Sequence, residues 1–207
     1  MITVIEPCCY PKQLSANLEE AEGWVSNGKD EHGNEIRVKR GPQIAHFFSY
    51  SDWGTDELVP WTLGSVPGCE AVLCLVQIDV RTIYMLSDVL RRTYISDRGS
   101  GTSDYVVKHL TVVTQTSRQD AEAQRREFRA QLGKFIDEGR VTVCEDSIGF
   151  RCIAASNGKR HLVVQGSLNQ CHMEPVTQMY TMTTSKQAYD MAMQMLSSKA
   201  RVKKIHL

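Results

Sequence analysis

The residues best suited to chemistry are concentrated in one stretch of the chain, between positions 151 and 174. Two histidines lie in it, and an imidazole titrates near neutral pH, so either side chain could serve as a nucleophile or a general base. The same stretch supplies a guanidinium, a hydroxyl, an amide and a carboxylate. In chain order, the six residues are Arg151, His161, Ser167, Asn169, His172 and Glu174. No two histidines of the chain have the i, i+4 spacing of a helical metal site, and we predict neither a metal ion nor a cofactor.

Each of these residues also has an ordinary structural interpretation. Gly166-Ser167-Leu168-Asn169 is typical of a turn that follows a strand. Arg151 lies in a β-like run, where it could pair with Glu145 or Asp146 at a sheet edge. Histidines beside a turn are commonly solvated or hydrogen-bonded side chains. The residue types alone leave both interpretations open.

The elements that must position these residues alternate between strands and helices. Apolar runs predict strands at 44–50, 71–78, 109–114, 141–144, 150–155, 161–165 and 177–183. Capping residues and helical periodicity predict helices at 55–63, 79–92, 117–138 and from Ser185 onward. We therefore expect an α/β fold, with a mixed β-sheet flanked by helices on both faces, in a single domain over 1–207. A polar segment at 23–43 predicts a hairpin or loop outside the core.

Composition excludes some classes of protein. The chain has 207 residues, with 24 Lys and Arg against 24 Asp and Glu, so no global field favours nucleic acid or a membrane surface. No run approaches the ~20 apolar residues that cross a bilayer, and no secretory leader is visible at the N-terminus. Seven cysteines without a C-x-x-C pair indicate reduced thiols. Three of them, Cys74, Cys144 and Cys152, lie in apolar runs and are expected to act as small hydrophobes. We predict a cytoplasmic protein that does not enter a membrane.

The order of elements from 109 to 190 resembles the phospholipase D-like superfamily. The similarity is closest to its short phage- and plasmid-borne members, which carry one catalytic motif per chain. In that family a strand bearing His-x-Lys leads through a hairpin into a second strand, which ends at a Gly-Ser-x-Asn turn with a glutamate a few residues later. Here the turn matches as Gly166-Ser167-Leu168-Asn169, and the acid as Glu174.

The resemblance fails at the nucleophile. The position of His-x-Lys aligns with Gly149-Phe150-Arg151, so glycine stands where the family has the histidine that attacks phosphorus. The resemblance still implies phosphate binding by Arg151, Ser167, Asn169 and Glu174, because a guanidinium suits a phosphate. It therefore implies a degenerate site that binds without cleaving.

The leading hypothesis is a catalytically degenerate protein that acts as a binding or assembly factor. The resemblance implies that it is encoded by a phage and acts in the host cytoplasm. Its expected partners are another protein, a second copy in a homodimer, or nucleic acid held at the phosphate site. The alternative is an active, metal-independent phosphodiesterase or nuclease in which His161 or His172 replaces the missing nucleophile. A third hypothesis, an unrelated α/β enzyme such as a nucleotide-modifying transferase, lacks any P-loop motif to support it.

Overall fold

The computed structural model describes residues 11–50, 55–76, 78–95, 103–114, 121–145, 151–166, 168, 177–197 and 203–204. Its helices are α1 (Pro11–Ala21), α2 (Thr55–Gly64), α3 (Val80–Arg91), α4 (Ala121–Asp137) and α5 (Lys186–Ser197). Its longer strands are β1 (Trp24–Lys29), β2 (Glu35–Lys39), β3 (Ile44–Tyr50), β4 (Cys69–Leu75), β7 (Val107–Thr114), β8 (Val141–Glu145), β9 (Cys152–Ser156), β10 (His161–Gly166) and β11 (Thr177–Thr183). The shortest strands are β5 (Thr93–Ile95), β6 (Ser103–Tyr105) and β12 (Lys203–Lys204). None of these described helices is long and apolar enough to span a membrane.

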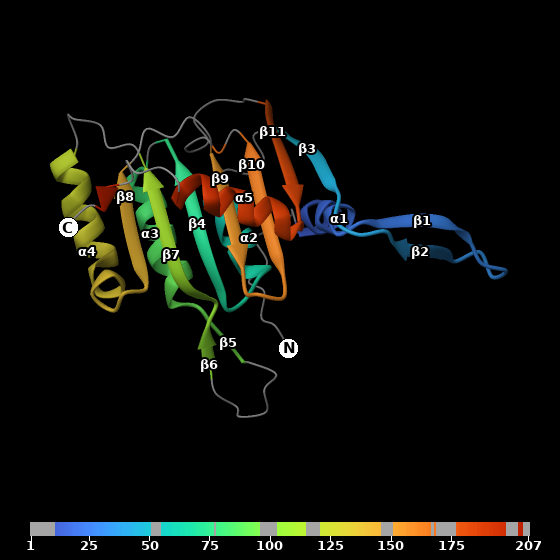
Figure 1. Ribbon diagram of the computed structural model, residues 1–207, viewed down its shortest axis with the longest axis horizontal. Helices are drawn as coiled ribbons and strands as arrows, with labels where there is room; N and C mark the ends of the chain where they lie inside the picture. The colour runs from blue at the N-terminus through green and yellow to red at the C-terminus, as the bar shows by residue number, and fades with distance from the viewer. Residues whose placement is uncertain are drawn as a thin grey trace.

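The main sheet has eight strands in the order β12-β8-β7-β4-β9-β10-β11-β3 (Figure 1). Strands β4, β7 and β8 run parallel to one another, as expected where helices connect successive strands. From β4 onward, the pairs β4–β9, β9–β10, β10–β11 and β11–β3 are all antiparallel. The sheet is therefore mixed, which confirms the prediction from the alternating elements.

Helices cover both faces of the sheet, but unequally. Leu73 of β4 belongs to the large core that also contains buried residues of α1, α2, α3 and α4. The next residue, Cys74, points to the other face, where a small cluster of buried residues packs against Met193 of α5. Figure 1 shows α5 lying across β9 and β10 on that second face, with α2 and α3 behind the sheet. The prediction of helices on both faces is confirmed.

Local sequence signals explain where several elements begin and end. The side chain of Asp79 accepts a hydrogen bond of 2.7 Å from the backbone N–H of Thr82 and so caps α3 as predicted. Ile83, Leu86 and Leu90 then lie on one buried stripe of that helix. Gly139 follows α4 with a φ of 71°, the left-handed conformation that commonly ends a helix.

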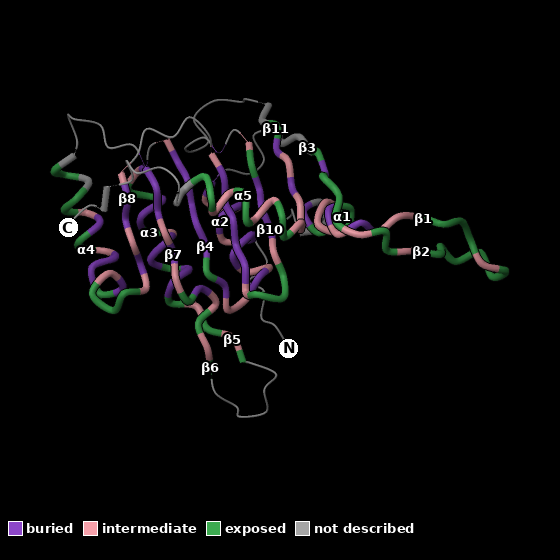
Figure 2. The backbone as a smooth tube through the Cα atoms, in the orientation of Figure 1, coloured by how far each residue is buried: buried purple, intermediate pink, exposed green. Residues whose placement is uncertain are grey.

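The polar segment after α1 forms an antiparallel hairpin, β1–β2, that projects away from the sheet (Figures 1 and 2). Its base is closed by two glycines: a Cβ atom on Gly23 would lie 1.7 Å from the carbonyl oxygen of Gly41. An ion pair of 2.6 Å between Arg37 and Glu19 ties the hairpin to α1. We call this hairpin the arm. Figure 2 shows it largely exposed, whereas the central strands of the sheet are buried.

The described cysteines are Cys69, Cys74, Cys144 and Cys152, and all four are buried. The last three belong to the small cluster under α5. The prediction that they act as small hydrophobes is confirmed.

Candidate phosphate-binding edge and a basic pocket

One edge of the sheet gathers the ends of strands that are far apart in the sequence. Leu75, Thr114 and Glu145, the last residues of β4, β7 and β8, lie in one register. Arg151, which precedes β9, and Gly166, the last residue of β10, lie at this same edge, since Cys152 pairs with both Cys74 and Gln165. We call it the carboxyl edge. In open α/β sheets, ligands bind in the crevice outside this end of the strands.

The two described parts of the predicted phosphate site are in contact there. The backbone N–H of Gly166 donates a hydrogen bond of 3.4 Å to the carbonyl oxygen of Arg151. Gly166 has no room for a side chain, because a Cβ would lie 2.4 Å from the carbonyl oxygen of Met179 and 2.7 Å from the ring of Tyr180. The glycine of the turn thus allows β11 to approach β10 closely. The remaining predicted site residues, Ser167, Asn169, His172 and Glu174, lie outside the described residues, as does Gly149.

Two charged side chains, those of Arg151 and Glu57, act on the buried phenol of Tyr180. Tyr180 pairs with Gly166 across β10 and β11 and is fully buried. Burial raises the pKa of Tyr180 to about 12, the positive charge of Arg151 lowers it, and the negative charge of Glu57 raises it. Both charges therefore act on the phenol, that of Glu57 from the first turn of α2 and that of Arg151 from the residue before β9.

Sequence reasoning missed Tyr180 and Glu57 as residues of this edge. A tyrosine in a predicted strand, such as Tyr180, is explained equally well by packing in the core. An acidic residue in the first turn of a helix, such as Glu57, is common in helices that bind no ligand. Only the pairing of β11 with β10 brings Tyr180 beside Gly166, and only the packing of α2 brings the charge of Glu57 close enough to act on that phenol.

His161 lies at the opposite edge of the sheet. It begins β10 and pairs with Ser156, the last residue of β9. The six residues of β10 span about 16 Å at about 3.3 Å per residue, and this length separates His161 from Gly166 and Arg151. The structure therefore does not bring His161 and Arg151 into one site. We call the edge that holds His161 the amino edge.

The imidazole of His161 is fixed by its neighbours. Its Nδ1 lies 2.8 Å from the hydroxyl oxygen of Ser156, which also accepts a hydrogen bond of 3.1 Å from the backbone N–H of Gly158. The ring of Tyr189 on α5 packs at 5.5 Å between centroids. Partial burial raises the pKa of Tyr189, and the carboxylate of Glu70 raises it further. His161 thus belongs to a packed polar cluster between the sheet and α5.

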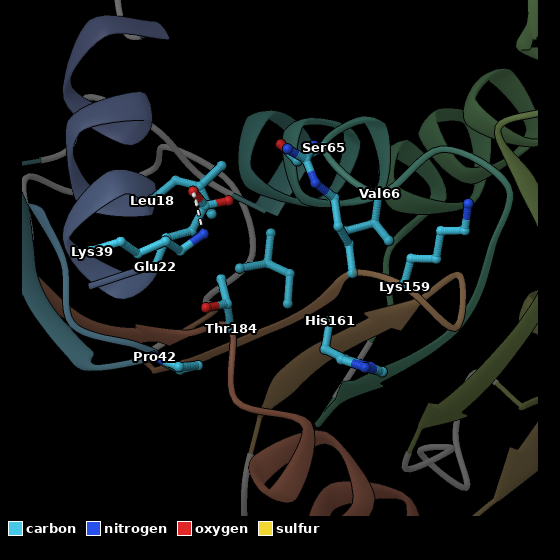
Figure 3. A pocket seen from close by; sticks show the side chains of 11 residues that line it. Leu18, Glu22, Lys39, Pro42, Ser65, Val66, Lys159, His161 and Thr184 are labelled. Carbon is cyan, nitrogen blue, oxygen red and sulfur yellow. Dashed lines mark ion pairs between the residues drawn. The ribbon is translucent and has the colours of Figure 1, made fainter. Parts of the chain in front are cut away.

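A pocket of about 230 Å³ lies beside His161 at the amino edge (Figure 3). Figure 3 shows Leu18, Glu22 and Lys39 on the side of α1 and the arm, with Lys159 and His161 across from them. The full lining is Leu18, Glu22, Lys39, Pro42, Ser65, Val66, Lys159, Arg160, His161, Leu162 and Thr184. Sequence reasoning gave no sign of this pocket, because its residues come from segments scattered over most of the chain.

Comparison with known proteins supports the fold and leaves the activity open. No protein-family model matches the sequence. No curated protein matches it either. Among solved structures, phosphatidylserine synthase from Haemophilus influenzae Rd KW20 has a TM-score of 0.54 at 11% sequence identity, over 84% of this chain and 43% of that protein. This chain thus covers less than half of that enzyme.

Two further solved structures have lower TM-scores. Polyphosphate kinase from Porphyromonas gingivalis gives a TM-score of 0.49 at 11% identity, over 78% of this chain and 27% of the kinase. TrmBL2, an archaeal chromatin protein whose structure shows a novel mode of DNA binding, gives 0.48 at 10% identity, over 81% of this chain and 56% of that protein.

At such identities a structural likeness establishes the fold alone. The phosphatidylserine synthase has a phospholipase D-like fold, and its similarity extends over most of the present chain. The mixed sheet, the helices on both faces and the β9–β10 hairpin agree with the fold expected from the sequence. The chain therefore has a phospholipase D-like α/β fold.

Proposed function

We propose that this chain is a phospholipase D-like binding or assembly factor that holds a phosphodiester at the carboxyl edge without cleaving it. The observation that carries the proposal is the backbone hydrogen bond between Gly166 and Arg151, because it joins the two strands that bear the family's motif. The sequence places a guanidinium at Arg151. Two residues earlier, where the family has its nucleophilic histidine, it has Gly149, which has no nucleophilic side chain. Such a site retains phosphate-binding groups and lacks the group that would attack phosphorus.

Nucleic acid is the first ligand to test, because its backbone is a chain of phosphodiesters. In an assembly role, the chain would also bind a protein partner, or a second copy of itself through the same edge. We propose these partners as well, together with the phage origin and the cytoplasmic location expected from the resemblance.

The experiment measures binding of a fluorescently labelled single-stranded oligonucleotide by anisotropy, at 50 and 200 mM salt. We expect Arg151→Ala and Asn169→Ala each to weaken binding about tenfold, the usual effect of losing one charge-assisted hydrogen bond. Arg91→Ala, which removes an exposed guanidinium at the end of α3, is the matched control and should leave affinity unchanged. If neither Arg151→Ala nor Asn169→Ala changes the affinity of folded protein, the proposal is wrong.

The alternative function, an active phosphodiesterase, now depends on His172, because His161 lies at the other edge of the sheet. The same protein, incubated with the oligonucleotide without added metal, tests it. We expect no cleavage. Cleavage that is lost in His172→Ala and kept in His161→Ala would establish the enzyme in place of the binding factor.

A further inference from the structure

The pocket at the amino edge has an excess of positive charge. Its lining includes three basic side chains, Lys39, Lys159 and Arg160, and one carboxylate, that of Glu22. The balance is +3 and −1, a net charge of +2 with histidine counted as neutral. Glu22 already pairs with Lys39 at 3.8 Å. Lys159 and Arg160 form no ion pair with an acidic side chain of the described segments. Within the described segments, two cationic heads are therefore available to an anion.

The turn that carries these two cations is rigidly held. The Asn157 side-chain oxygen accepts hydrogen bonds of 3.1 and 2.9 Å from the backbone N–H groups of Lys159 and Arg160. The same side chain donates a bond of 3.0 Å to the carbonyl oxygen of Pro67, which fixes the turn against the segment after α2. These bonds fix the backbone of the turn at the wall of the pocket, so the backbone need not be ordered on binding. The side chains of Lys159 and Arg160 are exposed and extend from this fixed backbone.

Apart from His161, the rest of the lining is apolar or has its hydroxyl groups already engaged. Leu18, Val66 and Leu162 give the pocket an apolar wall. The hydroxyls of Ser65 and Thr184 donate to the carbonyl oxygens of Trp61 and Ala21, at 2.8 and 3.1 Å. These hydroxyls therefore do not donate hydrogen bonds to a ligand in the pocket. The cationic side chains are the groups that would favour a negatively charged ligand.

We propose that this pocket is a second binding site, separate from the carboxyl edge, for a phosphate monoester. The phosphate lies against Arg160 and Lys39, with the ammonium of Lys159 farther away on the opposite wall (Figure 3). A small ester group lies against the apolar wall. A monoester carries a charge of about −1.5 to −2 at neutral pH, which matches the +2 of the lining, whereas a diester carries only one negative charge. The volume of about 230 Å³ limits the ligand to a small one or to the phosphorylated end of a larger one.

Trp24 provides a reporter for this site. Its indole N–H donates a hydrogen bond of 3.2 Å to Glu22, and the ammonium of Lys39 lies 5.4 Å from its ring centroid. A ligand that attracts Lys39 would change the charge above the indole. Tryptophan emission should therefore respond to binding in the pocket, and the response should be absent in Trp24→Phe.

The test titrates the full chain with phenyl phosphate and with its methyl diester, following tryptophan emission and confirming affinities by calorimetry. We expect saturable binding of the monoester and at least tenfold weaker binding of the diester. Arg160→Ala should weaken monoester binding about tenfold, and Lys159→Ala should weaken it less. Lys134→Ala, which removes an exposed ammonium on α4, is the matched control. Arg151→Ala should also have no effect, so this proposal and the one for the carboxyl edge can fail independently.

A second arm identifies the source of the phosphate by comparing an oligonucleotide with a 5′-phosphate and the same oligonucleotide with a 5′-hydroxyl, in the Arg151→Ala background. Preference for the phosphorylated end, lost in Arg160→Ala, indicates a nucleic-acid terminus. Binding of phenyl phosphate without that preference indicates a small metabolite. The proposal is overturned if the monoester does not bind, if the diester binds equally well, or if Lys159→Ala and Arg160→Ala both leave affinity unchanged.

Discussion

Arg151 and His161 lie at opposite ends of the same β-hairpin, one before β9 and the other at the start of β10. In the sequence they are ten positions apart and belong to the same cluster of polar residues between 151 and 174. Because β9 is extended, the chain crosses the sheet between them. The hairpin thus divides the polar residues of the 151–174 stretch between two edges of the sheet, each with its own charged side chains.

His161→Ala should therefore leave oligonucleotide binding at the carboxyl edge unchanged while lowering stability. The substitution removes the bond to Ser156 and the packing against Tyr189, and we expect a loss of about 1 kcal/mol in the free energy of unfolding. Urea denaturation and anisotropy on the same samples measure the two effects. A loss of binding as large as that of Arg151→Ala would contradict the separation of the two edges.

Glu57→Gln should strengthen anion binding at the carboxyl edge. The negative charge of Glu57 and the positive charge of Arg151 both act on Tyr180, so we expect removal of the negative charge to make the potential around this phenol more positive. We expect roughly a two- to fivefold gain in oligonucleotide affinity at low salt, decreasing as salt screens the charge. Glu70→Gln makes the same change on β4 at the amino edge and should give no gain. Equal gains in both variants would indicate a general charge effect instead of a local one.

Gly166→Ala should destabilise the fold, because its new methyl group would meet the backbone of Met179 and the ring of Tyr180. Overpacking of this kind costs about 1–3 kcal/mol. Gly64→Ala is the matched control, since a Cβ there meets nothing within 4 Å at the end of α2. Thermal melts of the two variants should differ by several degrees. Melting temperatures that coincide would show that β11 can move away from β10 at little cost.

Stability should fall at alkaline pH through two buried groups. Burial raises the pKa of Cys69 from 9.0 to about 12 and that of Tyr180 from 10.0 to about 12. The unfolded chain loses these protons first, so the stability they contribute is complete below about pH 9 and is lost as pH rises toward 12. Denaturation at pH 7, 9 and 10.5 should show a progressive loss, and Cys69→Ala should reduce it. A flat profile in the wild type would contradict the burial of both groups.

The sequence by itself determined the elements of this protein, because their signals are local. The cap at Asp79, the stripe of α3, the turn at Asn157-Gly158 and the glycine after α4 all act over a few residues. The alternation of strands and helices then limited the fold to a mixed sheet covered on both faces. The order of the final elements was also sufficient to indicate a phospholipase D-like fold.

Only the tertiary structure decided which residues share a site. Proximity in the chain grouped His161 with Arg151, whereas the sheet separates them. It instead brings Tyr180 beside Gly166, where the charges of Arg151 and Glu57 act on its phenol. Lys39 and Arg160, far apart in the sequence, meet in one pocket because α1 and the arm pack beside the start of β10. Sites of this kind depend on strand order and register between distant segments, and no local pattern encodes these, since they result from packing the whole core at once.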